Sequence, residues 1–386
     1  MFTTNYLPNI GGAELAFNEV AMRIPKISFD LIAPRLSEPS DRSRLLPSEE
    51  KFNNINVYRV GSRLNLIKLI LPKNLYPIAA YIKARELVKR FGPYGKVYAL
   101  QASQGGGGAW LFKIFNPDAV FLLNLQEGED LKKQGLLINF FRKLIIKKAD
   151  VIIAISNYLK DYARQVNKKA KIIVIPNGVD IANFSKEYSY GELSELADRL
   201  GIKPGERVII TVSRLVPKNG MDILIQALAL LNAQCSTLNA KLIIVGDGEQ
   251  KPELTSLAQR LGVAEKIVWV GSIRHPDLPR YLKISDLFIR PSRSEGLGSA
   301  FLEAMAAAVP IIGTKVGGIP DFLNNKETGL FAEVNNPEDL ADKISLILKD
   351  KNLAEKLKKN AGKLMVEKYN WDKIASQFRE LYELNK

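Results

Sequence analysis

The segment Glu295-Gly296-Leu297-Gly298-Ser299-Ala300-Phe301-Leu302-Glu303 places two carboxylates, with seven residues between them, around a glycine-rich turn. An apolar run at residues 287–290 precedes this segment and predicts a short buried strand, and residues 300–308 are strong helix formers. The turn is therefore expected at the carboxyl end of a strand, where open parallel sheets bind their ligands.

The residue types of this turn suit a sugar nucleotide. Gly296 and Gly298 let a ligand come close to the backbone, and the amides that open the helix lie where its dipole favours phosphate. A carboxylate accepts paired hydrogen bonds from hydroxyl groups, so two of them beside a phosphate pocket suit a ribose on one side and a hexose on the other. A plain helix with an acidic first turn would give the same residues.

The composition describes a globular protein with two domains. At 386 residues the chain exceeds what one hydrophobic core usually organises, and its hydrophobic content is 46%. Its single cysteine, Cys235, excludes a disulfide framework, and the lack of Cys or His clusters argues against structural zinc, so no metal site is expected. The N-terminus has no signal-peptide pattern and no run approaches 18 apolar residues, so we expect a cytoplasmic protein without a membrane span.

The net charge of +14 is concentrated in the N-terminal half, because residues 1–180 hold 27 Lys and Arg against 15 Asp and Glu. Such a half suggests a nucleic acid, an anionic membrane surface or a phosphorylated substrate as partner. Residues 64–91 and 131–148 interleave apolar and aromatic side chains with Lys and Arg, as interfacial helices do. Helices that cover a sheet and expose solvated lysines give the same pattern. No basic run is organised around stacking aromatics, so nucleic acid is not expected.

Short β-branched runs alternate with helical stretches along the whole chain, which is typical of parallel sheets covered by helices on both faces. The fold class is therefore α/β, with one sheet in each half. Strands of the first half are expected at residues 27–32, 55–60, 96–100, 120–124, 151–155 and 171–175. Strands of the second half are expected at residues 208–212, 242–245, 267–270, 287–289 and 310–313, with closing helices in 337–386.

Several motifs of the second half occur together in the order and spacing of one known family. They are Ser213-Arg214-Leu215-Val216-Pro217, Val245-Gly246-Asp247-Gly248, the strand and turn at 268–272, Ser285-Asp286-Leu287-Phe288-Ile289-Arg290-Pro291-Ser292, the opening segment, and Val316-Gly317-Gly318-Ile319-Pro320-Asp321. The first half matches more loosely, through Gly11-Gly12-Ala13-Glu14, Ala149-Asp150-Val151-Ile152-Ile153-Ala154-Ile155-Ser156 and Val174-Ile175-Pro176-Asn177-Gly178-Val179-Asp180. With these motifs the sequence resembles glycosyltransferase family 4, the retaining, nucleotide-sugar-dependent enzymes of glycosyl transferases group 1.

The resemblance implies the GT-B fold, in which two Rossmann-like domains with parallel sheets face each other across a cleft. We expect an N-terminal acceptor-binding domain at residues 1–183 and a C-terminal nucleotide-sugar-binding domain at 184–368. Residues 369–386 are then a C-terminal helix that packs back on the N-terminal domain. Trp371 resembles the start of that helix.

The resemblance assigns catalytic roles to charged residues. Glu295 would hold the donor sugar hydroxyls near the reacting centre, and Arg214 would neutralise the diphosphate. Bond cleavage places negative charge on the leaving nucleoside diphosphate, which fixed cations and amides stabilise without a metal. Family members commonly read Arg-Leu-x-x-x-Lys-Gly, whereas Asn219 stands where that Lys is expected. Either Lys218 reaches the phosphate through a shifted loop, or Asn219 donates a neutral hydrogen bond and Arg214 carries more of the charge.

The resemblance also implies a set of donor-binding residues. Glu303 would hold the ribose, backbone groups near Gly271 would read the base, and the Gly11-Gly12 amides would meet the phosphates from the opposite domain. Only residues 2–4 remain of the apolar strand that usually precedes this glycine pair. The expected donor-binding residues are Glu303, Gly296, Leu297, Gly298, Ser299, Asn219, Gly11, Gly12 and Gly271.

The acceptor side lacks the histidine that many relatives carry after the strand matching 120–125. This chain has Gln126 and Glu127 there, and either can position an acceptor hydroxyl, whereas an acidic surface loop is the alternative. The sole histidine, His275, lies in a loop where relatives often have one without a catalytic duty. The four glycines at 105–108 either open a helix beside the acceptor cleft or form a flexible lid.

The sequence predicts a retaining glycosyltransferase that moves a hexosyl group from a UDP- or GDP-linked sugar to a lipid-linked or glycan acceptor. The donor is a substrate, and no cofactor is expected. The basic half suggests a peripheral position on the anionic inner face of the cytoplasmic membrane. The rivals are a sugar-nucleotide epimerase or phosphorylase of the same fold, and a non-enzymatic basic scaffold with a decayed site. No motif for a pyridoxal phosphate lysine supports the phosphorylase.

Overall fold

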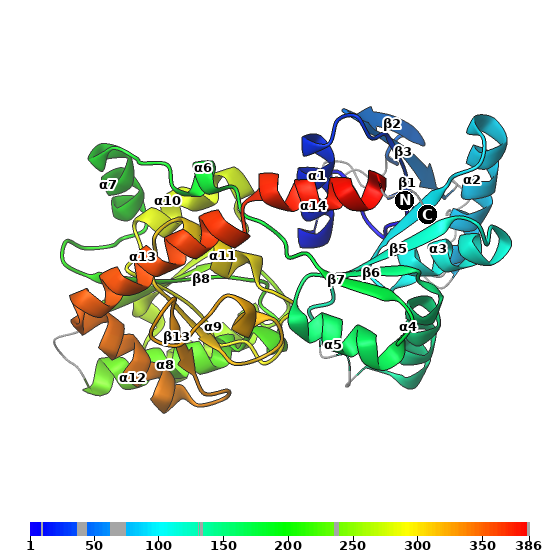
Figure 1. Ribbon diagram of the computed structural model, residues 1–386. Coiled ribbons are helices and arrows are strands. Elements are labelled where there is room, and N and C mark those ends of the chain that lie inside the picture. Colours follow the sequence, from blue (N-terminus) through cyan, green and yellow to red (C-terminus); the bar gives the residue numbers. More distant parts are fainter. Residues whose placement is uncertain are drawn as a thin grey trace. The chain divides into compact units, whose positions relative to one another are not determined.

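The computed structural model describes residues 1–8, 11–36, 45–61, 75–129, 131, 134–234 and 239–383. Residues 64–74 and 132–133 of the two basic segments, and Cys235, lie outside this described part. The chain divides into two compact units, the first made of Met1–Asn177 and Trp371–Lys386 and the second of Gly178–Asn370 (Figure 1). Each unit is built on parallel strands with helices against them, as the alternation of apolar runs and helical stretches predicts.

The first unit contains a parallel four-stranded sheet in the order β4 (Lys96–Leu100), β5 (Val120–Leu125), β6 (Val151–Ala154) and β7 (Lys171–Val174). A second sheet has the order β1 (Phe29–Pro34), β3 (Ile55–Val60) and β2 (Glu49–Phe52), in which β2 is antiparallel to β3. Phe2 joins the two sheets, because it bridges Ile32 of β1 and Ala99 of β4. The expected strand at residues 2–4 is thus reduced to one bridging position.

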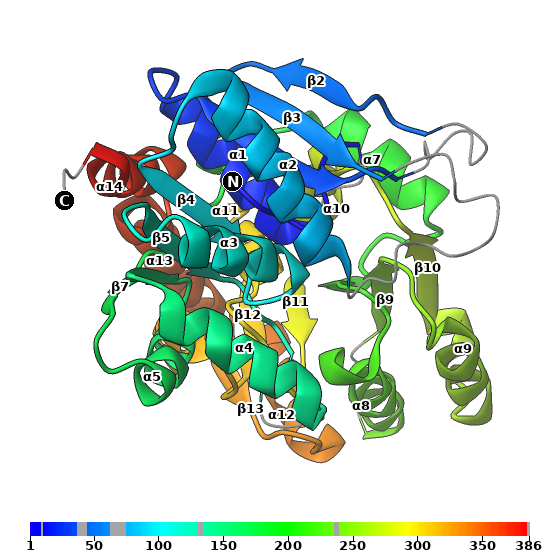
Figure 2. The same cartoon turned by 90° about the vertical axis from the view of Figure 1, so that its right-hand side faces the viewer.

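Helices of the first unit are α1 (Gly12–Arg23), α2 (Tyr76–Phe91), α3 (Gln104–Phe115), α4 (Leu136–Lys148), α5 (Asn157–Val166) and α14 (Trp371–Glu383). The C-terminal helix α14 packs against α1, and Arg23 Nε donates to Asp372 Oδ1 at 2.9 Å. This confirms the predicted return of the last helix to the N-terminal domain. Figure 2 shows α2 and α3 side by side.

The four glycines of α3 are sites of close packing. A Cβ on Gly106 would lie 2.7 Å from the carbonyl oxygen of Gln101, and one on Gly108 would lie 2.8 Å from the Phe2 ring. All four glycines are buried in the first turns of α3. The alternative of a flexible lid at residues 105–108 is therefore wrong, because these glycines lie buried and closely packed within a helix.

The second unit contains one parallel sheet of six strands in the order β10-β9-β8-β11-β12-β13. The strands are β8 (Arg207–Val212), β9 (Ala240–Val245), β10 (Ile267–Gly271), β11 (Leu287–Arg290), β12 (Ile311–Thr314) and β13 (Leu330–Ala332). The chain builds outward from β8 through β9 to β10 and then returns to the other side of β8 with β11. The strand order therefore reverses between β8 and β11, and ligands of open α/β sheets bind at such a switch point.

The helices of the second unit cover this sheet around a core of aliphatic side chains. They are α6 (Ile181–Phe184), α7 (Tyr190–Arg199), α8 (Met221–Gln234), α9 (Lys251–Arg260), α10 (Leu278–Lys283), α11 (Ser299–Ala306), α12 (Pro337–Lys349) and α13 (Lys351–Lys368). No helix within the described residues is both long enough and apolar enough to cross a membrane.

Candidate active site

The switch point of the second sheet brings two predicted site segments together. Arg214 lies just past the carboxyl end of β8, and Glu295 lies just past that of β11, and these two strands are hydrogen-bonded neighbours. The Arg214 side chain is exposed at this edge. A cation and a carboxylate from adjacent strand ends thus lie where this type of sheet binds ligands.

Glu295 is held from both its side chain and its backbone. Its carboxylate forms an ion pair with Arg290 Nη2 and accepts the Gly296 amide at 3.0 Å, and its side chain is only 13% exposed. Its carbonyl oxygen accepts the Gly318 amide at 3.2 Å. Gly317 has φ +52, and a Cβ there would lie 1.7 Å from the Glu295 carbonyl oxygen. The glycine pair at 317–318 therefore lets its loop close onto the Glu295 backbone.

The glycine-rich turn opens helix α11 as the sequence predicts. Gly298 is the N-cap with φ 102, a left-handed conformation that favours glycine, and α11 begins at Ser299. Leu297 is buried, which anchors the turn in the core below. The segment from Gly296 to Ser299 therefore joins the carboxyl end of β11 to the N-terminus of α11, and helix N-termini are sites where phosphate is commonly bound.

Glu303 lies one turn into α11 and contacts the sole histidine. His275 Nε2 lies 2.8 Å from Glu303 Oε1, and the His275 ring packs edge-on against Phe184 at 5.5 Å between ring centroids. The pair fixes one oxygen of the carboxylate that is predicted to take the ribose. Sequence reasoning gave His275 no role, and only its place after β10, at the same edge of the sheet, could have indicated this contact.

Gly271 is the last residue of β10 and lies at this same sheet edge. It has φ +76, and its carbonyl oxygen accepts the Gly246 amide at 2.8 Å. A Cβ on Gly271 would have no atom within 4 Å, so the space beside this residue is open. Its assigned part in base recognition stays a prediction.

In the loop after β8, the side chain of Asn219 forms a hydrogen bond within the protein. Its side chain is buried, and its amide nitrogen donates to the Arg214 carbonyl oxygen at 2.7 Å. Lys218 is half-buried, and its carbonyl oxygen accepts the Arg293 amide at 2.6 Å. Asn219 therefore shapes the Arg214 backbone from inside the loop. Direct contact of Lys218 or Asn219 with a diphosphate stays a prediction.

Arg293 fastens this loop to the strand-end loop that follows β11. Its guanidinium forms two hydrogen bonds to Asp222, at 2.9 and 2.6 Å, and one to the Pro217 carbonyl oxygen at 2.6 Å. Gly220 has φ +70, and a Cβ there would lie 2.1 Å from the Pro291 carbonyl oxygen. The loops that carry Arg214 and Glu295 are therefore braced against each other.

In the first unit, Gly11 and Gly12 begin helix α1. The Gly11 amide donates to Glu14 Oε2 at 3.1 Å, and Glu14 is itself buried and bonded to the Thr3 hydroxyl at 3.1 Å. A Cβ on Gly12 would meet no atom within 4 Å. Packing within the first unit thus does not require a glycine at position 12. The open space beside Gly12 suits a position that a ligand approaches.

The candidate acceptor residues after β5 are both engaged. Gln126 and Asn177 exchange two amide hydrogen bonds, at 3.1 and 2.8 Å. Glu127 is buried and accepts the Ala102 amide at 2.6 Å. Burial raises the pKa of the Glu127 carboxyl, against the opposing effects of that amide and of Arg142. The alternative of an acidic surface loop is therefore wrong for Glu127, and its contact with an acceptor stays a prediction.

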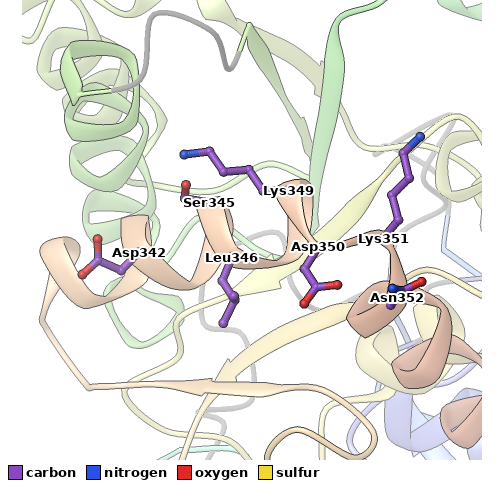
Figure 3. A pocket seen from close by; sticks show the side chains of 7 residues that line it. All are labelled: Asp342, Ser345, Leu346, Lys349, Asp350, Lys351 and Asn352. Carbon is purple, nitrogen blue, oxygen red and sulfur yellow. The ribbon is translucent and has the colours of Figure 1, made fainter.

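A shallow surface hollow lies where α12 passes into α13, and Figure 3 shows the side chains that line it. Lys349 and Lys351 point away from Asp350 in this view, and Asp350 is the N-cap of α13, accepting the Leu353 amide at 2.9 Å. None of the residues predicted to bind the donor lines this hollow. Among the residues that the structure describes, no group of three His, Cys, Asp or Glu side chains could hold a metal ion.

Comparison with known proteins gives matches in both units. The family model described as Glycosyl transferases group 1 matches residues 194–364, and the one described as Glycosyltransferase Family 4 matches residues 10–183. The Bacillus anthracis N-acetyl-alpha-D-glucosaminyl L-malate synthase is 28% identical over 71% of this chain and 70% of its own length. A Mycobacterium tuberculosis GDP-mannose-dependent alpha-(1-6)-phosphatidylinositol monomannoside mannosyltransferase is 30% identical over 60% of this chain and 61% of its own.

Among solved structures, Anabaena Alr3699/HepE in complex with UDP-glucose matches with a TM-score of 0.78. The match covers 99% of this chain and 98% of that chain at 21% sequence identity. This likeness shows a shared fold over nearly the whole chain.

Proposed function

Because the chain belongs to the glycosyltransferases of group 1 and family 4 and has their GT-B fold, we propose that it transfers a hexosyl group with retention of configuration from a UDP- or GDP-linked sugar to a lipid-linked or glycan acceptor. Enzymes of this family use nucleotide-sugar donors. The family favours a transferase over an epimerase, a phosphorylase or a decayed scaffold.

The observation that carries the donor site is the strand-end arrangement at the switch point of the second unit. Arg214 follows β8, the α11 turn follows β11, and Glu295 and Glu303 lie on either side of that turn. A diphosphate at the α11 N-terminus would have the helix amides and a cation beside it, with hydroxyl acceptors for the sugar and for the ribose. The same groups stabilise the charge that develops on the leaving diphosphate.

Calorimetry and a donor screen test this function. We expect one of UDP, GDP and ADP to bind in the micromolar range, and one of the corresponding nucleotide sugars to be consumed when an acceptor is present. A product with the anomeric configuration of its donor would support retention. Binding of none of the three nucleotides would contradict the proposal, because the α11 turn would then hold no diphosphate.

The acceptor proposal rests on the surface of helix α4. Its first half exposes Leu136 at 91% and Phe140 at 57%, together with Leu137, Ile138 and Phe141, and its second half exposes Lys143, Lys147 and Lys148. Helix α4 buries Ile145 and Ile146, as a covering helix does, but it also leaves these five apolar side chains exposed. The exposed apolar side chains support the interfacial alternative over that of a solvated covering helix. Apolar residues followed by cations suit insertion between anionic lipid headgroups.

We therefore propose that the first unit docks through α4 on an anionic membrane surface, where a lipid-linked acceptor would be presented. The mannosyltransferase relative is named for a phosphatidylinositol acceptor, whereas the synthase relative is named for malate. The relatives thus support more than one acceptor class, and the surface of α4 favours the lipid-linked one.

Vesicle co-sedimentation tests the docking of α4. We expect binding to phosphatidylglycerol vesicles, weak binding to phosphatidylcholine vesicles, and loss of binding as salt rises, because the lysine contribution is screened. The Phe140→Ser/Phe141→Ser variant should bind at least about tenfold more weakly, since each buried aromatic contributes roughly 1.5–3 kcal/mol.

Charge variants provide the matched control for this docking. Lys147→Glu/Lys148→Glu should lose binding to anionic vesicles, whereas Lys359→Glu/Lys363→Glu, the same charge change on exposed residues of α13, should keep it. Equal binding of the wild-type chain to anionic and neutral vesicles would contradict the proposal.

A further inference from the structure

Arg290, the last residue of β11, is a buried cation inside the candidate donor site. Its side chain is only 9% exposed, and its Nη2 forms the ion pair with Glu295. Glu295 lies five residues later in the chain, across the strand-end loop. A buried guanidinium is costly to desolvate unless a carboxylate faces it, so the Arg290 and Glu295 side chains depend on each other.

Contacts from three directions fix the Arg290 guanidinium. Its Nη1 donates to the Val212 carbonyl oxygen at the end of β8 at 3.4 Å, and its plane lies over the Phe301 ring of α11, 5.0 Å from the centroid. A Cβ on Gly298 would lie 3.2 Å from Nη2. Arg290 therefore contacts β8, the glycine turn and the helix that together form the donor site.

These contacts determine where the Glu295 carboxylate points. One of its oxygens receives Arg290 and the other receives the Gly296 amide, while its backbone is held by Gly318. A carboxylate offers about four lone-pair sites, so the sites that Arg290 and Gly296 leave open are available to hydroxyl donors. Without Arg290, the Glu295 backbone would keep its position, but the Glu295 side chain would lose its orientation.

We propose that Arg290 is a positioning residue that keeps the Glu295 carboxylate oriented toward the hydroxyl groups of the donor sugar. It acts through Glu295 and does not contact the donor. The inference rests on the proposed function, in which Glu295 holds that sugar. A displacement of about 1 Å at a reacting centre lowers rates about 10²-fold, which sets the scale of the expected effect.

The test compares Arg290→Met and Arg290→Lys with the wild-type chain. Arg290→Met should lower kcat for the nucleotide-sugar donor about 10²-fold, while the Kd of the free nucleoside diphosphate stays within about twofold, because no sugar is present to sense Glu295. Arg290→Lys, which keeps the charge but not the planar guanidinium, should recover part of kcat.

A double-mutant cycle separates this role from a structural one. If Arg290 acts through Glu295, Arg290→Met/Glu295→Gln should be no slower than Glu295→Gln alone. The double variant also leaves neither charge buried without its partner, so it can still be compared with Glu295→Gln even if Arg290→Met is too unstable to assay. A double variant slower than Glu295→Gln would then contradict the inference. Additive losses in the cycle would overturn the inference.

Arg207 provides the matched control. It begins β8 and pairs with Asp286 at 2.9 Å, at the opposite end of the same two neighbouring strands. Arg207→Met should leave kcat unchanged. If folded Arg290→Met kept full kcat while Glu295→Gln was inactive, the role of Arg290 would be overturned and that of Glu295 would stand. Full turnover by Glu295→Gln would instead contradict the proposed function.

Discussion

Replacing Glu295 by alanine is expected to lower kcat about 10²–10³-fold and to leave the affinity for the free nucleoside diphosphate within about twofold. The physical reason is that this carboxylate is fixed beside the glycine-rich turn at residues 296–299. There it would hold the hydroxyl groups of the sugar and not the nucleotide. Interactions that strengthen as the sugar–phosphate bond breaks affect kcat, whereas nucleotide binding does not sense them. Steady-state donor turnover and calorimetry with UDP or GDP measure the two quantities.

Glu303 provides the matched control, since it lies in α11 on the other side of the glycine-rich turn and has an equally small exposed fraction, 13% for each side chain. Glu303→Ala should weaken nucleoside diphosphate binding, because it removes the predicted ribose contact, and should affect kcat less. Glu295→Gln keeps the size of the side chain and isolates the effect of its charge. Turnover that survived Glu295→Ala would remove the central assignment of the site.

The sequence predicts the donor turn well because its signals are local. An apolar run gives β11, glycines give a turn that needs φ 102 at Gly298, and helix formers give α11 from Ser299. The same dependence on local signals explains why the sequence does not predict two of the strands. Strand β2 is mostly charged, and β13 has only three residues, so neither shows the apolar run by which the other strands are recognised.

The contacts that orient the site could not be predicted, because they join side chains whose positions depend on the strand order. Arg293 reaches Asp222, which lies 71 positions away, and His275 reaches Glu303, 28 positions away. The sequence shows Arg290 only as the end of an apolar strand. Its pairing with Glu295 follows from the packing of β8, β11 and Phe301 around one guanidinium.

The loop after β8 shows how a departure from a family pattern can be understood once the structure is known. Asn219 replaces a cation, and the sequence leaves open whether it donates to the phosphate. Its buried amide donates to the Arg214 carbonyl oxygen, so the residue helps to shape the loop that carries Arg214. Because Asn219 carries no charge, we expect Arg214 to be the main side-chain cation for the diphosphate.

Arg214→Met is therefore expected to lower kcat about 10²–10³-fold and also to weaken nucleoside diphosphate binding. The guanidinium would contact the diphosphate before the reaction and stabilise it more strongly as it leaves with added charge. Because one cation is replaced by Asn219, the remaining charge comes mainly from the amides of the α11 turn. This result should differ from that of Glu295→Ala, which affects kcat without affecting nucleotide affinity.

Two variants distinguish a specific phosphate contact from a general loss of positive charge. Lys218→Met removes the adjacent cation and should cost less than Arg214→Met if Lys218 does not reach the diphosphate. Arg274→Met removes an exposed arginine from the turn after β10 and should leave kcat and nucleotide affinity unchanged. An Arg214→Met variant with wild-type nucleotide affinity and kcat would show that the diphosphate is not neutralised from the β8 loop.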